Sequence, residues 1–71
     1  MVLVCVYESA SYKILHITDS ITEALDFKDT SGNPNAHIFA LTPTKTEKEK
    51  LLTELKVGAT LPEYLIIKLE G

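Results

Sequence analysis

The chain has 71 residues, a formal net charge of −3 at neutral pH, and a hydrophobic content of 45%. This length fits a single domain over residues 1–71, and the apolar content is too high for a disordered chain of such small net charge. Cys5 is the only cysteine. A disulfide framework is therefore excluded, as is any site that needs several thiolates.

The charge distribution argues against a nucleic-acid partner, and the length of the longest apolar run argues against a membrane span. All seven basic residues are lysines, so the chain lacks the guanidinium fork that recognises guanine or phosphate in bidentate fashion. Residues 1–35 hold two lysines against five acids, and residues 36–71 hold five of each, so neither half is basic. The longest apolar run, Met1–Tyr7, is too short to span a bilayer. A cytoplasmic location is the expectation.

The first half of the chain predicts a strand hairpin followed by a helix. Val2–Tyr7 is a continuous apolar run rich in β-branched residues, typical of a strand buried on both faces. Small polar residues separate it from a second predicted strand, Tyr12–Thr18. The sequence Ser20-Ile21-Thr22-Glu23 matches a capping box and begins a helix that ends by about Phe27–Asp29. The turn formers of residues 30–35 then break the chain.

The second half predicts a strand, a helix and a last strand. Ala36–Thr42 alternates as a third strand and ends at Pro43. A second helix covers Thr44–Val57, and capping boxes at residues 44–47 and 46–49 leave its first residue open. Its apolar stripe consists of Leu51, Leu52 and Leu55, and Gly58 follows as the expected C′ residue.

Pro62 marks the entry to the last predicted strand, Glu63–Leu69. In this strand one face would carry Leu65, Ile67 and Leu69, and the other Tyr64, Ile66 and Lys68.

The element order β-β-α-β-α-β predicts an α+β fold. Its simplest arrangement is a two-layer α/β sandwich, in which both helices cover one face of a mixed four-stranded sheet. Strands one and two would form an antiparallel hairpin. Two short helices cover only one side of such a sheet, yet the first strand is apolar on both sides. The other face would then expose an apolar surface, which favours a homodimer or a protein partner.

The residues capable of chemistry form no recognisable catalytic or metal-binding motif. Cys5 lies among valines, without the electropositive neighbours of a reactive thiol. His16 and His37 each lie in a predicted strand, and their spacing matches no metal-ligand pattern. The acids around the first predicted helix fit a solvated face better than a cleft. We therefore expect no metal, no cofactor and no enzymatic activity.

The leading hypothesis is a small protein-interaction module that self-associates and acts as a regulatory or inhibitor-type protein. Its contact surface would be the apolar and aromatic sheet face, with Tyr7, Tyr12, His16 and Tyr64 as the interaction residues. One alternative is an enzyme whose active site lies at a dimer interface and uses His16 or His37 as a base. Another is a weak single-stranded nucleic-acid binder that stacks bases on the sheet aromatics.

Overall fold

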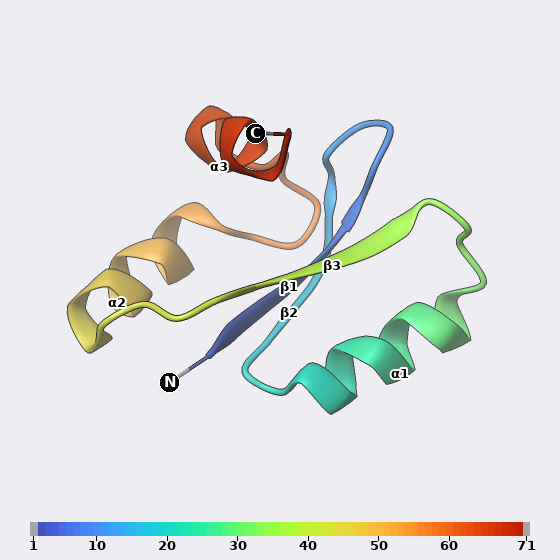
Figure 1. Cartoon of the computed structure of the whole chain (residues 1–71), viewed down its shortest axis with the longest axis horizontal. Helices are drawn as coiled ribbons and strands as arrows, with labels where there is room; N and C mark the ends of the chain where they lie inside the picture. The colour runs from blue at the N-terminus through green and yellow to red at the C-terminus, as the bar shows by residue number, and fades with distance from the viewer. Residues whose placement is uncertain (1, 71) are drawn as a thin grey trace.

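The computed structural model describes residues 2–70 and contains a three-stranded antiparallel sheet and three helices (Figure 1). The strands are β1 (Leu3–Glu8), β2 (Ile14–Thr18) and β3 (Ala36–Leu41). The helices are α1 (Ile21–Ser31), α2 (Lys45–Glu54) and α3 (Glu63–Glu70). The predicted α+β class and the β1–β2 hairpin are confirmed, whereas the fourth strand and the mixed sheet are wrong.

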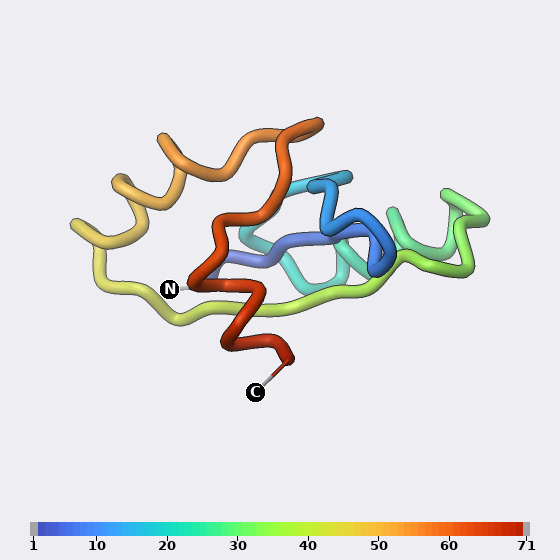
Figure 2. The backbone as a smooth tube through the Cα atoms, turned by 90° about the horizontal axis from the view of Figure 1, so that it is seen from above, coloured from blue at the N-terminus to red at the C-terminus, as the bar shows by residue number. Residues whose placement is uncertain are grey.

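The strand order is β2-β1-β3, with β1 in the centre and antiparallel to both neighbours. Helix α1 lies on one face of this sheet, and α2 and α3 lie on the other (Figures 1 and 2). The fold therefore has three layers rather than the predicted two. The sheet face that the sequence led us to expect in solvent is covered by the C-terminal part of the chain. No helix within residues 2–70 is long and apolar enough to cross a membrane.

Strand β1 supplies side chains to a core on each of its faces. Leu3 and Cys5 belong to a buried cluster with residues of β2 and of the C-terminal segment, namely Ile14, Leu55, Leu61 and Leu65. Val4 and Val6 face the other way and pack with Ala24 of α1 and Ala36 of β3. Because side chains alternate along a strand, a two-sided apolar sequence is satisfied only by layers on both sides.

The segment predicted as a fourth strand is helix α3. Its apolar residues fit both periods, because Leu61, Leu65 and Leu69 also recur every fourth residue, on one face of a helix. Leu61 and Leu65 are buried, and the carbonyl of Pro62 accepts the first helical hydrogen bond from the Ile66 N–H at 3.2 Å. The spacing of the apolar residues alone does not distinguish a strand from a helix here. The helix forms because it buries one face of the segment against the sheet.

The N-terminus of α1 follows the prediction in one half of its capping box. The Ser20 hydroxyl accepts a hydrogen bond from the Glu23 N–H at 3.3 Å. The Glu23 carboxylate does not return to the cap but bonds to Thr18 and His16 of β2. The helix continues to Ser31, beyond the predicted end, and is closed by Gly32, whose φ of 66° suits glycine.

Helix α2 begins at the first of the two possible capping boxes and ends earlier than predicted. The Thr44 hydroxyl accepts from the Glu47 N–H, and the Glu47 carboxylate accepts from the Thr44 N–H. The Thr44 N–H lowers the pKa of the Glu47 carboxyl most, and the Thr44 hydroxyl beside that carboxyl lowers it further. The helix ends at Glu54 because Leu55 becomes extended and enters the core, so Gly58 lies in a later turn.

The stretch between α2 and α3 covers the outer edge of β2 at its first residue, Ile14. The Ile14 N–H donates to the Ala59 carbonyl and the Ile14 carbonyl accepts from the Gly58 N–H, both at 2.8 Å. The Leu61 N–H donates to the Tyr12 carbonyl at 2.9 Å, on the far side of a bridge between Lys13 and Thr60. Residues 58–61 thus occupy the place of a fourth strand without forming a regular one.

The helical form of α3 is tested by comparing Leu65→Ala with Ile67→Ala. Leu65 is 4% exposed and Ile67 is 62% exposed. We expect Leu65→Ala to lower the free energy of unfolding by about 2–5 kcal/mol because it leaves a cavity, and Ile67→Ala to change it by less than about 0.5 kcal/mol. Denaturant unfolding at the lowest practical protein concentration measures both. Equal losses would contradict the helix, since a strand places both side chains on one face.

Candidate interaction surface

Two of the four residues singled out from the sequence, Tyr7 and Tyr12, meet on the face of the sheet that α3 covers. Their rings stack with centroids 6.1 Å apart and planes 9° apart. Both rings pack against the buried cluster that contains Leu65. The Tyr12 hydroxyl donates to the Glu70 carboxylate at 2.6 Å, and this bond raises the pKa of Tyr12. The pair anchors the end of α3 rather than forming an open aromatic surface.

Tyr64 lies on α3 and has 53% of its surface exposed. Its hydroxyl donates to the Glu54 carboxylate at 2.8 Å, which joins α3 to the end of α2 and raises the pKa of Tyr64. The tyrosine was placed on a strand by the sequence reasoning. Its actual position on a covering helix separates it from the sheet surface to which it was assigned.

His16 lies on the opposite face of the sheet, against α1. A β-bulge between Val6 and Tyr7 sets two residues of β2 against one of β1, and Leu15 and His16 both pack toward α1. The imidazole stacks on Phe27 with ring centroids 4.5 Å apart, and its Nε2 lies 3.2 Å from a Glu23 oxygen. The structure therefore brings Tyr7 and Tyr12 together and leaves His16 and Tyr64 elsewhere.

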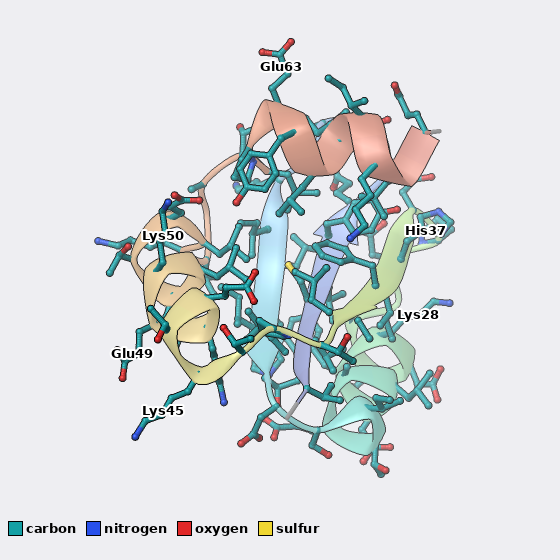
Figure 3. The ribbon with its side chains drawn as sticks, turned by 60° about the vertical axis from the view of Figure 1, so that its left-hand side comes forward. Lys28, His37, Lys45, Glu49, Lys50 and Glu63 are labelled. Carbon is teal, nitrogen blue, oxygen red and sulfur yellow. The ribbon has the colours of Figure 1, made fainter. Side chains whose placement is uncertain are left out.

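The candidate catalytic residues have different surroundings. Cys5 is buried, and burial raises the pKa of its thiol to about 12, so the thiolate is scarce at neutral pH. His37 is exposed on β3, turned away from the sheet in Figure 3, with its ring centroid 5.9 Å from that of Tyr7. Within residues 2–70, no three histidine, cysteine, aspartate or glutamate side chains gather closely enough to hold a metal ion.

A groove of about 450 Å³ lies between α2, α3 and the end of β3. Its polar lining consists of Thr42, Glu47, Lys50, Glu54, Tyr64 and Lys68. Glu47 already caps α2, and Glu54 already accepts from Tyr64. Two lysines stand beside two carboxylates, so the groove selects no ligand charge.

The outer edge of β3 is open along the length of the strand, whereas the edge of β2 is covered at Ile14. The Ser9 N–H donates to the Asn35 carbonyl at 2.9 Å, which directs the backbone of residue 35 toward β1. Alternate residues of a strand point their N–H and C=O groups to opposite edges. Residues 37, 39 and 41 therefore also face β1, opposite residues 7, 5 and 3.

The residues between these positions direct their backbone groups outward. The Ala36 N–H donates to the Asn33 carbonyl at 3.1 Å, which shows the outward direction. The N–H and C=O groups of Ile38 and Ala40 point the same way and have no hydrogen-bond partner within residues 2–70. Figure 1 looks toward this edge, with α3 above it and α1 below it.

Strand β3 also lacks the devices that normally protect a sheet edge. Its sequence, AHIFAL, contains no lysine, no acidic residue and no proline, and its pairing with β1 runs without a bulge. The absence of charge was visible in the sequence. The position of this strand at an open edge was not, because strand order does not follow from the pattern of residues.

No family model matches the chain, and no curated protein or solved structure is significantly similar to it.

The bonds around Glu23 predict a pH-dependent contribution to stability. The Thr18 hydroxyl, at 2.9 Å, lowers the pKa of Glu23 most, and His16 lowers it further. A carboxyl whose pKa falls on folding stabilises the fold above its unfolded pKa, and this effect disappears as the pH drops through the folded value. We expect Glu23→Gln to lower the melting temperature at neutral pH, with the difference vanishing by about pH 3.

The control for this measurement is Glu49→Gln, which removes the same charge from the exposed face of α2 (Figure 3). Thermal unfolding of both variants is followed by circular dichroism across this pH range. A loss of equal size in the two variants, or one that persists in acid, would contradict the assigned role of the Thr18–Glu23 bond.

Proposed function

We propose that this protein is a small, non-enzymatic protein-interaction module that binds an extended protein chain along the outer edge of β3. The carrying observation is the set of unpaired backbone groups on Ile38 and Ala40 in an uncharged strand. An edge of this kind accepts a further strand by main-chain hydrogen bonding, as in β-augmentation. The proposal keeps the protein-interaction role inferred from the sequence and moves it from a sheet face to a sheet edge.

The physical basis of the binding site is the difference between the two edges of the sheet. The edge of β2 is covered at Ile14 by residues 58–61, which leaves only the backbone groups of Ile17 facing outward. The edge of β3 offers the outward groups of two residues, Ile38 and Ala40, and nothing within residues 2–70 bonds to them. Side chains contribute as well, because Ala40 is exposed and Ile38 half-buried on the side of α1. A bound strand would cover both. Such a module suits a regulatory or inhibitor-type role.

The proposal is tested with a peptide that copies residues 35–42, acetylated, amidated and fluorescently labelled. We expect its anisotropy to rise when the protein is added at concentrations low enough to limit self-association. Ala40→Pro removes one outward N–H without touching the bonds to β1, a position where an edge strand tolerates proline. It should weaken peptide binding about tenfold or more.

The matched control is Ala40→Thr, which also enlarges the side chain but keeps the N–H and suits a strand. It should bind the peptide like the wild-type chain. Circular dichroism and the melting temperature show whether both variants remain folded. Absence of peptide binding to the wild-type chain, or equal binding by the folded Ala40→Pro variant, would overturn the proposal.

A further inference from the structure

We infer that the strand bound at the β3 edge is the β3 of a second copy of this chain, joined by a two-fold axis into a six-stranded sheet. This inference rests on the proposed function and names its partner. It differs from the dimer expected from the sequence, which joined two sheet faces. The contact is edge to edge, between Ala36–Leu41 of the two chains.

Hydrogen-bond accounting selects one antiparallel register. If Ile38 lies opposite the partner's Ala40, these two residues exchange two hydrogen bonds. By symmetry, Ala40 and the partner's Ile38 exchange two more. All outward N–H and C=O groups of the two residues are then satisfied. A register that sets Ala40 opposite the partner's Ala36 fails, because the Ala36 N–H already donates to the Asn33 carbonyl. A shift of the register in the other direction sets Ile38 opposite the partner's Thr42, and residue 42 lies outside the strand.

The side chains fit this register. The two-fold axis passes beside Phe39, so the two Phe39 residues face each other as a non-hydrogen-bonded pair, the closer of the two pair types. On the other face, the branched Ile38 lies against the small Ala40 of the partner, whose exposed surface leaves room for it. Neither strand contains a lysine, arginine, aspartate or glutamate, and the facing residues 38, 39 and 40 are all apolar, so the contact sets no like charges against each other.

The symmetry of the contact limits it to two chains. Pairing two β3 edges about a two-fold axis uses both edges, so no further copy adds at β3. At the other side of the sheet, residues 58–61 cover the edge of β2 at Ile14 and leave only a short open stretch, which carries the outward backbone groups of Ile17. A very short edge is a poor template for a further strand.

Figure 2 shows the geometric condition for this dimer. Seen along the sheet normal, α3 crosses the strands, and its C-terminal end lies beyond β3. Figure 1 places that helix above the plane of the sheet rather than in it. In a dimer about an axis normal to the sheet, both α3 helices lie on the same face, so the dimer requires their C-terminal ends to pass each other above the joined β3 strands. A peptide carries no α3 helix that must be accommodated beside the edge. Peptide binding and dimerisation of the folded chain are therefore separate tests.

Sedimentation equilibrium from low micromolar to several hundred micromolar protein tests the inference. We expect the wild-type chain and Ala40→Thr to approach a mass of about 16 kDa, twice the 7.9 kDa of one chain. Ala40→Pro should remain near 7.9 kDa over the same range. A wild-type mass that stays near the single-chain value overturns the inference. So does a folded Ala40→Pro variant that still dimerises, since its contact would lie elsewhere.

The register has its own test, by oxidative cross-linking. A cysteine at position 39 lies opposite its copy at a Cα separation of about 4.5 Å, within the range of a disulfide. Because the native Cys5 lies opposite residue 39 in β1 and could form an intrachain disulfide with it, both cysteine variants are made in a Cys5→Ala background. Phe39→Cys should then form a covalent dimer under mild oxidation. His37→Cys, on the same face of the strand but opposite the partner's Leu41, should not. Equal cross-linking at both positions, or cross-linking only at 37, overturns the register.

The two proposals fail in distinguishable ways. If the wild-type chain binds the labelled peptide but sediments as a monomer, the edge accepts a strand and not a second folded copy. The proposed function then stands and the dimer is overturned. If neither peptide binding nor dimerisation occurs, both are overturned.

Discussion

The fold depends on the burial of β1 on both of its faces. Its side chains alternate between two separate cores, one shared with α1 and the other with the C-terminal segment. A 71-residue chain has little apolar surface to spare, and a strand of this kind is stable only when it is covered on both sides. The three-layer arrangement follows from this requirement. It also fixes α3 as a helix, because a fourth strand would have left one side of β1 in water.

The tyrosines have a structural role because the sheet face on which Tyr7 and Tyr12 lie is covered. Tyr12 and Tyr64 each donate a hydroxyl to a glutamate at the end of a helix, and these bonds hold α3 to the hairpin and to α2. Their rings add apolar contact area beside the core, and their polar ends remain near solvent. The same residue type would mark a binding surface on an open sheet face. Here the tyrosines attach the layer that covers it.

The two edges of the sheet differ in how much of their backbone is hydrogen-bonded to the rest of the chain. The edge of β2 is covered at Ile14 by chain that has already packed into the core at Leu55 and returns to it at Leu61, so these hydrogen bonds come with the folding of the C-terminal segment. The edge of β3 lies where the chain leaves α1 and continues to α2, and no later segment within residues 2–70 returns to it. The longer of the two open edge stretches therefore belongs to β3.

Sequence alone determined the local structure of this protein and the two-sided character of β1. The strand runs, the Ser20 and Thr44 caps and the break near Gly32 follow from interactions between residues close in the chain. The form of residues 63–70 was decided only in the tertiary structure, because Leu65 and its neighbours satisfy both a strand and a helix period until a face is chosen for burial. The open edge of β3 was likewise invisible in the sequence. Strand order is set by which layers meet across the core, and no residue in β3 records that nothing pairs with its outer side.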